Sequence, residues 1–296
     1  MRLVNNQADI ALTMLNKFCD EVKPRGAWRW QCAVQNGALL PLDASFAGGF
    51  LRLTTPLRPG DDCALALHRA IVRNGTLTGG VKTVFHAVRN EFFLCADLVV
   101  IGEQQLLSRL KWALNGFHDG LTASNPARGE DAADHAASIG APRNGIADLM
   151  QDSRWECHPR AEGEYSVALD AKSAPPATVR VGQQGLSIGV ELARTGNDAL
   201  ASEYALALYL LSASSHMRLV RALRTGTQTQ RIFLLEAQLP HRPEAEEVDH
   251  ALAALSVAYR QSANEAIALL DEAAARSYLA VRGCSIAPEP NNREEN

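Results

Sequence analysis

The sequence lacks the features that mark secreted and membrane proteins. Its start, Met1–Gln7, has neither the basic stretch nor the apolar core of a signal peptide. No segment comes near the run of about 18 apolar residues that a membrane-spanning helix requires. We therefore expect a cytoplasmic protein that does not enter a membrane.

Cysteine spacing and net charge exclude further classes. The six cysteines are scattered and form no Cys-X-X-Cys pair. Reduced, buried thiols are expected for the four that lie in apolar segments, namely Cys32, Cys63, Cys95 and Cys157. A formal net charge of −4 is too small to indicate a nucleic-acid or membrane partner.

Short catalytic and cofactor-binding motifs are absent as well. The chain has no phosphate-binding loop, no strand-borne dinucleotide motif, no zinc-protease motif and no hydrolase nucleophile elbow. Asp131, Asp134 and His135 could share one helical face, but nothing nearby completes a metal shell. We therefore predict that the protein is not an enzyme and has no catalytic residues, no cofactor and no metal site.

Two pairs of carboxylates are the only candidates for acid–base chemistry. Strand alternation places Glu91 and Asp97 on one face, and Glu191 could meet Glu203. A catalytic pair also needs a cleft and shifted pKa values, which the sequence cannot show. Exposed surface positions are the simpler interpretation of both pairs.

What the chain does contain is an internal duplication. The segment Arg29–Cys32 matches Arg154–Cys157 at an offset of 125 residues, and Leu42-Asp43 matches Leu169-Asp170 at an offset of 127. The segment Phe92–Leu98 matches Phe233–Leu239 at an offset of 141 residues. The offsets only grow, as insertions in loops would produce, and the unit is too long for a solenoid repeat. Trp30 and Trp155 are accordingly predicted to occupy equivalent places.

The duplication divides the 296 residues into two domains of ordinary size. Residues 1–120 form the first unit, 121–145 a linker, 146–283 the second unit, and 284–296 a disordered tail. Periodicity and turn signals predict the order α-β-β-β-α-β-β-α for each unit. The predicted fold class is α+β, with antiparallel sheets in two tandem units that pack as a pseudo-dimer.

The pattern also predicts individual elements. In the first unit we expect a helix over 6–22, a hairpin of strands 28–34 and 39–43 around Asn36-Gly37, a strand over 50–55, a helix ending near 73, a hairpin of 81–89 and 92–100, and a helix over 103–117. In the second unit we expect a helix over 146–151, strands over 155–159, 165–171, 178–181 and 186–192, a helix over 200–211, a hairpin of 217–223 and 231–239, and a long, broken or bent helix over 243–279. Residues 217–223 could instead extend the preceding helix, but their counterpart 81–89 is rich in β-formers, which favours a strand.

This element order resembles the type III secretion chaperone fold, which YbjN-like proteins share. The resemblance is carried by four segments, namely the opening helix 10–18, the strand 50–55 before the helix 63–72, the apolar strand 92–100 and the closing helix 106–117. It implies a non-enzymatic protein that holds an extended segment of a protein or peptide client. Such chaperones form homodimers of one unit, so two fused copies would resemble that dimer within one chain.

The charges of the two units favour pairing within the chain. Residues 1–120 carry 13 basic and 10 acidic residues, a net of +3, whereas residues 146–283 carry 13 and 17, a net of −4. Opposite charges attract over about 8–10 Å. We therefore expect a monomer with internal pseudo-two-fold symmetry.

Four residues are candidates for partner binding. Trp28 has no match in the repeat, which makes it the better surface candidate among the tryptophans. Arg218, Arg221 and Arg224 form a basic hairpin without the interleaved aromatics of single-strand nucleic-acid binders. A solvated sheet edge, or a contact with the acidic segment Glu244–Glu247, would also explain these arginines. The alternative function is an enzyme or small-molecule sensor with a pocket between the two units.

Overall fold

The computed structural model describes residues 2–36, 38–57, 63–122, 154–161, 163–171, 173–182, 185–196, 199–227 and 229–284. Its first unit consists of helix α1 (Arg2–Phe18), strands β1 (Glu21–Gly26), β2 (Arg29–Asn36), β3 (Ala38–Ala47) and β4 (Phe50–Leu57), helix α2 (Cys63–Arg73), strands β5 (Val81–His86) and β6 (Glu91–Val99), and helix α3 (Glu103–Thr122). Its second unit consists of strands β7 (Cys157–Ala161), β8 (Glu164–Val167), β9 (Ala177–Gly182) and β10 (Gly185–Gly196), helix α5 (Leu200–Ser214), strands β11 (Val220–Gly226) and β12 (Gln230–Leu239), and helices α6 (Ala245–Ala268) and α7 (Glu272–Val281).

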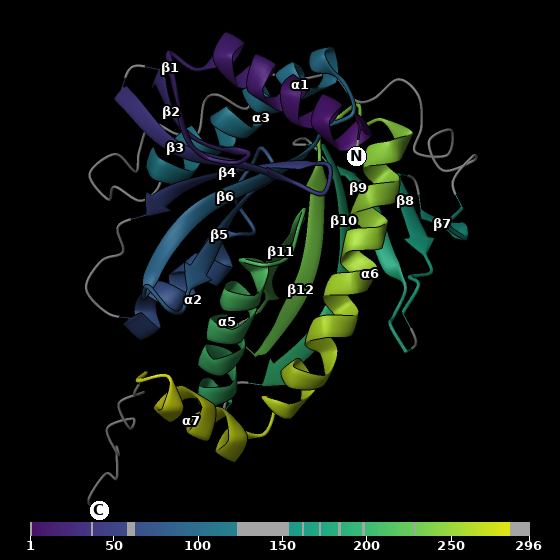
Figure 1. Ribbon diagram of the computed structural model, residues 1–296. Helices are drawn as coiled ribbons and strands as arrows, with labels where there is room; N and C mark the ends of the chain where they lie inside the picture. Colours follow the sequence, from purple (N-terminus) through teal and green to yellow (C-terminus); the bar gives the residue numbers. More distant parts are fainter. Residues whose placement is uncertain are drawn as a thin grey trace, which may run out of the picture.

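The two units have the same sheet topology. The first sheet runs β1-β2-β3-β4-β6-β5, and the second runs β7-β8-β9-β10-β12-β11, with every pairing antiparallel. The predicted α+β fold of two tandem units with antiparallel sheets is thus confirmed (Figure 1). Each unit has four strands before its central helix, however. Four separate strands were listed for the second unit, but the predicted order gives three, and only three were listed for the first.

The missing strand is β1, which carries no alternating pattern. Nearly all its side chains are exposed on both faces, and Pro24 interrupts it. Because a proline and two polar faces are typical of a loop, no strand is predicted here, and the first helix is expected to run to residue 22. The helix instead ends at Phe18. Tertiary pairing with β2 makes Glu21–Gly26 a strand.

The pairing register corrects the alignment of the two units. In β1, Pro24 pairs with Trp30, and a bulge separates Pro24 from Gly26. In β7, Pro159 pairs with Tyr165, and an equivalent bulge separates Pro159 from Ala161. The offset is therefore 135 positions, so the counterpart of Trp30 is Tyr165. The predicted equivalence of Trp30 and Trp155 is wrong, because Trp155 precedes β7 and shared letters do not fix strand register.

The predicted offset of 141 for the longest strands is confirmed. Leu51 pairs with Leu98 on β6, and Leu186 pairs with Leu239 on β12. Since Leu51 and Leu186 are 135 positions apart, Leu98 and Leu239 hold equivalent places. The hairpin expected around Asn36 is also present, with Asn36 paired to Ala38.

Three further expectations can be compared with the structure. Val220–Gly226 is a strand and not an extension of the preceding helix. The long C-terminal helix breaks between α6 and α7, where the Asp271 side chain accepts a hydrogen bond from the Ala274 amide and caps α7. The expected helix 146–151, the linker 121–145 beyond Thr122, and the tail beyond Cys284 lie outside the described residues.

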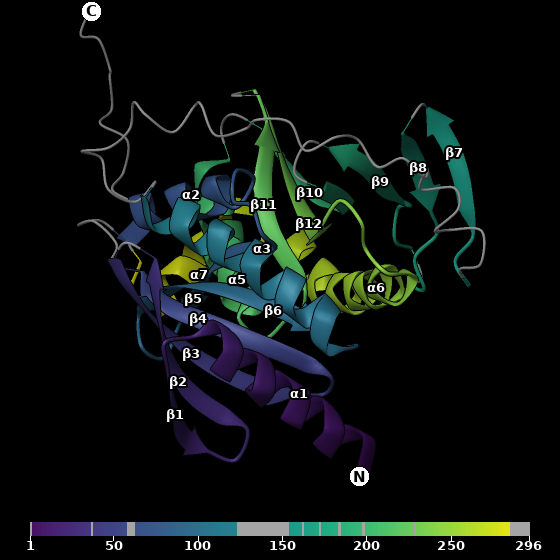
Figure 2. The same ribbon diagram turned by 90° about the horizontal axis from the view of Figure 1, so that it is seen from above.

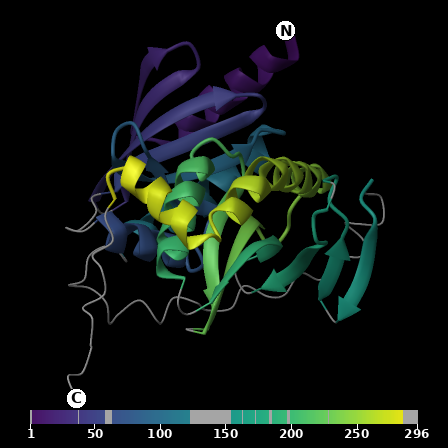
Figure 3. The ribbon, with the colours of Figure 1, turned by 90° about the horizontal axis from the view of Figure 1, so that it is seen from below.

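The helices sort into outer and inner positions. α1 and α3 pack on one face of the first sheet, and α6 packs on the second sheet. α2 and α5 lie between the two sheets, and α7 lies against α5 (Figures 1 and 3). α5 is buried on most sides, which suits its nearly uniform apolar composition. No helix in the described part of the chain is long and apolar enough to cross a membrane.

The hydrophobic cores show how tightly the units join. One core belongs to the first unit alone, beneath α1 and α3. The other combines the second unit with residues of α2, β5 and β6, among them Leu67, Ile71 and Phe85. The elements α2, α5, β5 and β11 contact one another across the junction. Seen from above, β1 and β7 lie at opposite ends of the molecule (Figure 2). The two units are therefore packed as a pseudo-dimer.

Candidate functional site

Charged residues of the two units meet across reciprocal contacts at the centre of the molecule. Val81 and Val220 are equivalent, since they pair with Ala96 and Ala237 at the same place in the two sheets. The next residues, Lys82 and Arg221, are therefore equivalent as well. Both are buried, at 1% and 4% exposure.

Each of these two cations donates to main-chain carbonyls of the opposite unit. Lys82 Nζ donates to the carbonyls of Met217 at 2.6 Å and Val220 at 2.9 Å. Arg221 Nη1 donates to the carbonyls of Leu77 at 2.7 Å and Val81 at 3.4 Å. Lys82 donates to the Val220 carbonyl and Arg221 to the Val81 carbonyl, so these two contacts are reciprocal.

The turns that precede β5 and β11 also form reciprocal hydrogen bonds between the two units. The Leu219 amide donates to Asp97 Oδ2 at 3.2 Å, and the Gly80 amide donates to Gln238 Oε1 at 3.1 Å. Gly80 and Leu219 both adopt left-handed backbone conformations, with φ of 65° and 59°. A leucine in this region is strained, so tertiary contacts hold it there.

Asn74 lies where β5 and β11 approach each other. Its side-chain amide donates to the carbonyls of Thr83 at 3.1 Å and Ala222 at 2.8 Å, and its oxygen accepts from the Thr83 amide at 2.6 Å. Thr83 and Ala222 are equivalent residues of the two units. One fully buried asparagine thus bridges both units.

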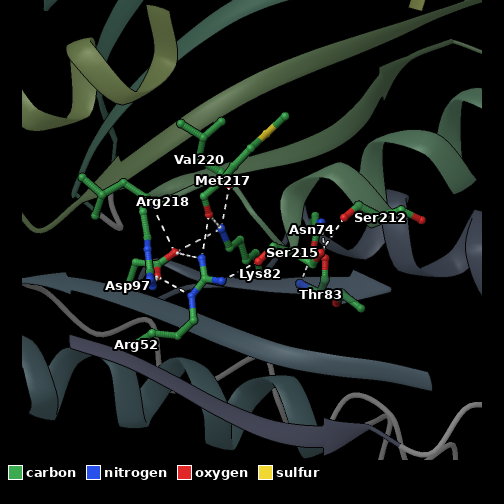
Figure 4. A network of polar contacts seen from close by, with 11 residues as sticks. Arg52, Asn74, Lys82, Thr83, Asp97, Ser212, Ser215, Met217, Arg218 and Val220 are labelled. Carbon is green, nitrogen blue, oxygen red and sulfur yellow. Dashed lines mark hydrogen bonds and ion pairs between the residues drawn. The ribbon is translucent and has the colours of Figure 1, made fainter. Parts of the chain in front are cut away.

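Asp97 is the centre of a buried ionic cluster. Its carboxylate accepts from Arg52 at 2.7 and 3.0 Å and from Arg218 at 3.0 Å, and lies 3.1 Å from Lys82 Nζ. Arg52 also donates to the carbonyls of Ser215 and Met217 in the second unit (Figure 4). The Asp97 side chain is fully buried. A single carboxylate therefore holds three cations at the junction of the units.

The cluster sets the protonation of its members. Burial alone would raise the pKa of Asp97, but Lys82, Arg52 and Arg218 together hold it well below its ordinary value. Burial raises the pKa of the neighbouring Cys95 thiol, which disfavours a reactive thiolate. The arrangement joins the two units electrostatically.

A second ionic cluster surrounds Glu203 on α5. The carboxylate lies 3.3 Å from His68 on α2, 3.0 Å from Arg224 on β11 and 2.7 Å from Arg231 on β12. Burial would raise its pKa, but the contacts with His68 and the two arginines lower it below the ordinary value. His68 belongs to the first unit, so this cluster also joins the units.

The three predicted arginines lie at the junction of the units, where Arg221 and Arg224 contact Leu77 and His68 of the first unit. Arg218 binds Asp97, Arg221 binds Glu236 at 2.7 Å, and Arg224 lies beside Glu203. The acidic helix α6 uses Glu247 for a different contact, with Arg109 of α3 at 2.6 and 2.7 Å. Binding of an outside partner by Arg218, Arg221 and Arg224 stays a prediction.

Trp28 occupies a separate place, at the tip of the outer hairpin of β1 and β2. It is 44% exposed, and its ring packs edge-on against the buried Phe46 ring, with 6.3 Å between the ring centroids. Its backbone is left-handed, with φ of 54°. The equivalent residue 135 positions later is Gly163, with φ of 71°. Glycine meets the backbone requirement without strain in one unit, and tryptophan occupies the same position in the other.

The candidate acid–base and metal residues are not assembled into a site. Asp97 is surrounded by cations, whereas Glu91 lies exposed at the start of β6. Glu191 pairs with Arg194 on the surface. Within the described ranges, no group of three or more His, Cys, Asp or Glu side chains could hold a metal ion. Asp131, Asp134 and His135 lie outside those ranges.

Sequence reasoning missed Arg52 and Lys82 as functional candidates. Lys82 lies within the apolar strand Val81–His86, where a charge is unexpected unless it is paired. That signal was available, but it names no partner, because Lys82 and Val220 are distant in sequence. No family model, no curated protein and no solved structure matches this chain.

Proposed function

We propose that the chain is a non-enzymatic protein-binding module that holds an extended segment of a protein or peptide partner. It would be a single-chain version of the homodimers formed by type III secretion chaperones and YbjN-like proteins, whose element order it resembles. The observation that carries the proposal is the reciprocal interface of two units with one topology. On this proposal, the interface would do within one chain what dimerisation does for single-unit chaperones.

The outward surfaces support the proposal. The interface uses α2, α5, β5 and β11, which leaves the opposite sheet edges, β1 and β7, at the two ends of the molecule. On β3, Leu42 and Phe46 face the core, whereas Leu39 on the other face is 67% exposed. An exposed apolar side chain on a sheet face offers a contact for a partner.

The edge strands favour binding through side chains over strand addition. Both β1 and β7 carry a proline followed by a bulge, at Pro24 and Pro159. Proline and bulges limit main-chain pairing at a sheet edge. A client would therefore lie against sheet faces and hairpin tips.

Selection of random peptides on the full-length protein tests the proposal. We expect selected peptides to bind in extended form and to protect amides of the outer strands from hydrogen exchange. Failure to recover any peptide above background, at protein concentrations that detect micromolar binding, would contradict it.

A further inference from the structure

We infer that the outer hairpin of the first unit, residues 21–29, binds an acidic segment of a partner protein, with Trp28 as its aromatic contact. This inference rests on the proposed protein-binding function and names the chemistry of the partner. We call this surface the Trp28 tip. The equivalent hairpin of the second unit, residues 156–164, lacks these features and serves as a built-in comparison.

The first argument is the backbone of Trp28. A bulky residue with positive φ is an outlier, because its Cβ crowds the backbone. The turn itself does not demand tryptophan, since Gly163 forms the equivalent turn with φ of 71°. Strain held at an exposed aromatic side chain points to a role for that side chain outside the fold. Exposed tryptophans are strongly enriched among residues that dominate binding energies.

The second argument is charge. Arg25 and Arg29 are exposed on either side of Trp28. Arg25 is held by the neutral Gln31 side chain, with Nε to Oε1 at 3.1 Å, so its charge is not compensated there. Lys23 pairs with Glu21 at 2.6 Å. In the part of the chain that the structure describes, neither Arg25 nor Arg29 pairs with a carboxylate, so the tip presents two guanidinium groups beside an exposed indole.

The equivalent hairpin has a different charge pattern. Glu164 replaces Arg29 and pairs with Arg180 at 2.9 Å. Gly163 replaces Trp28, so no ring is presented there. Arg160 alone matches Arg25. Among the described residues of the two hairpins, an aromatic ring thus lies beside basic side chains at the tip of the first hairpin and not at the tip of the second.

A protein partner fits this tip better than a nucleic acid or an anionic membrane. Both polyanions require many cations for useful affinity. The whole chain has a formal net charge of −4, and the tip presents few basic side chains. Two guanidinium groups match one or two carboxylates in bidentate contacts, and the indole matches an apolar side chain between them.

Titration of the full-length protein with defined peptides tests the inference. The probe is a short acetylated peptide of alternating Glu and Ser with one central Phe, and the control peptide carries Lys in place of Glu. We expect the Trp28 indole N–H signal in NMR spectra to shift with the acidic peptide only. Trp28→Gly should weaken binding by more than about tenfold, and the double change Arg25→Glu with Arg29→Glu should reverse the peptide preference.

The matched control is Arg160→Glu in the second hairpin, which should leave binding unchanged. Unfolding curves of each variant establish that it folds, and Arg25 and Arg29 are exposed enough for charge reversal. Equal binding of both peptides, or full binding by Trp28→Gly, would overturn the inference. Tighter Trp28-dependent binding of an oligonucleotide or of anionic vesicles would also overturn it. Library peptides that bind and protect only other strands would refute the Trp28 tip while leaving the proposed function standing.

Discussion

At the junction of the two units, Lys82 and Arg221 occupy equivalent positions, and each donates to carbonyls of the opposite unit. At the outer hairpins, by contrast, Trp28 is matched by Gly163 and Arg29 by Glu164. Residues at the junction must satisfy both units at once, so a change on one side leaves a buried polar group unpaired on the other. The outer hairpins have no such constraint. The comparison separates residues that hold the pseudo-dimer together from residues free to acquire a binding role.

The largest effect is expected when the central carboxylate loses its charge. Asp97→Asn keeps the shape of the side chain but leaves Arg52, Lys82 and Arg218 without their anion. Breaking a buried ionic cluster in this way costs about 3–5 kcal/mol. Urea unfolding of the variant should show this loss in the free energy of unfolding.

The control for Asp97→Asn is Glu103→Gln, which removes a surface pair with Lys17 that is about half exposed on both sides. Its cost should stay below about 1 kcal/mol. If Asp97→Asn is as mild as this control, the cluster does not join the units.

A slightly smaller effect is expected from each of the two equivalent cations. Lys82→Met and Arg221→Met each remove donors to two carbonyls of the opposite unit, and each leaves a carboxylate with fewer partners. We expect losses of about 2–4 kcal/mol that are similar in the two variants. A large loss in one and none in the other, measured by urea unfolding, would show that the interface is not reciprocal.

Acid should weaken the interface through Asp97. Because its pKa in the folded protein lies below the ordinary value of 3.8, its contribution is fully present above that value. The contribution is lost as pH falls toward the folded pKa. The free energy of unfolding should therefore decline from about pH 5 to about pH 3, and it should decline less steeply in Asp97→Asn. Parallel pH profiles for the two proteins would contradict this assignment.

The smallest effects are expected at the outer hairpins. Gly163→Ala should cost about 1 kcal/mol, because φ of 71° disfavours any Cβ although no atom lies within 4 Å of it. Trp28→Gly should change stability by less than about 1 kcal/mol, because backbone relief offsets the lost contact with Phe46. Thermal unfolding compares the two. A large loss in Trp28→Gly would make the ring a structural element of the first unit.

The sequence predicted the duplication and most elements, but it did not predict the interface. Offsets were correct for β6 and β12, because long apolar strands leave a strong pattern. The predicted offset was wrong by ten positions for Trp30, because identical residues in two segments carry no information on strand pairing. The repeated Glu-X-X-Pro-Arg at Glu21–Arg25 and Glu156–Arg160 was the signal that gives the correct offset.

The ionic clusters could not be predicted, because their partners come from distant segments. Asp97 looked like an exposed strand residue, and Arg218 belonged to a basic hairpin with three open explanations. Only the packing of the two units against each other brings Asp97 and Arg218 together. The role of Trp28 in partner binding stays a prediction, although its lack of a tryptophan counterpart agrees with Gly163 at the equivalent turn.

The central claim is that each unit covers a surface that the other would leave exposed. Leu67, Ile71 and Phe85 of the first unit are buried in a core shared with the second. Light scattering of the whole chain, and of residues 1–120 expressed alone, measures this most directly. The account predicts a monomer for the whole chain, and a homodimer or aggregate for the fragment. A soluble, folded, monomeric fragment would contradict the pseudo-dimer.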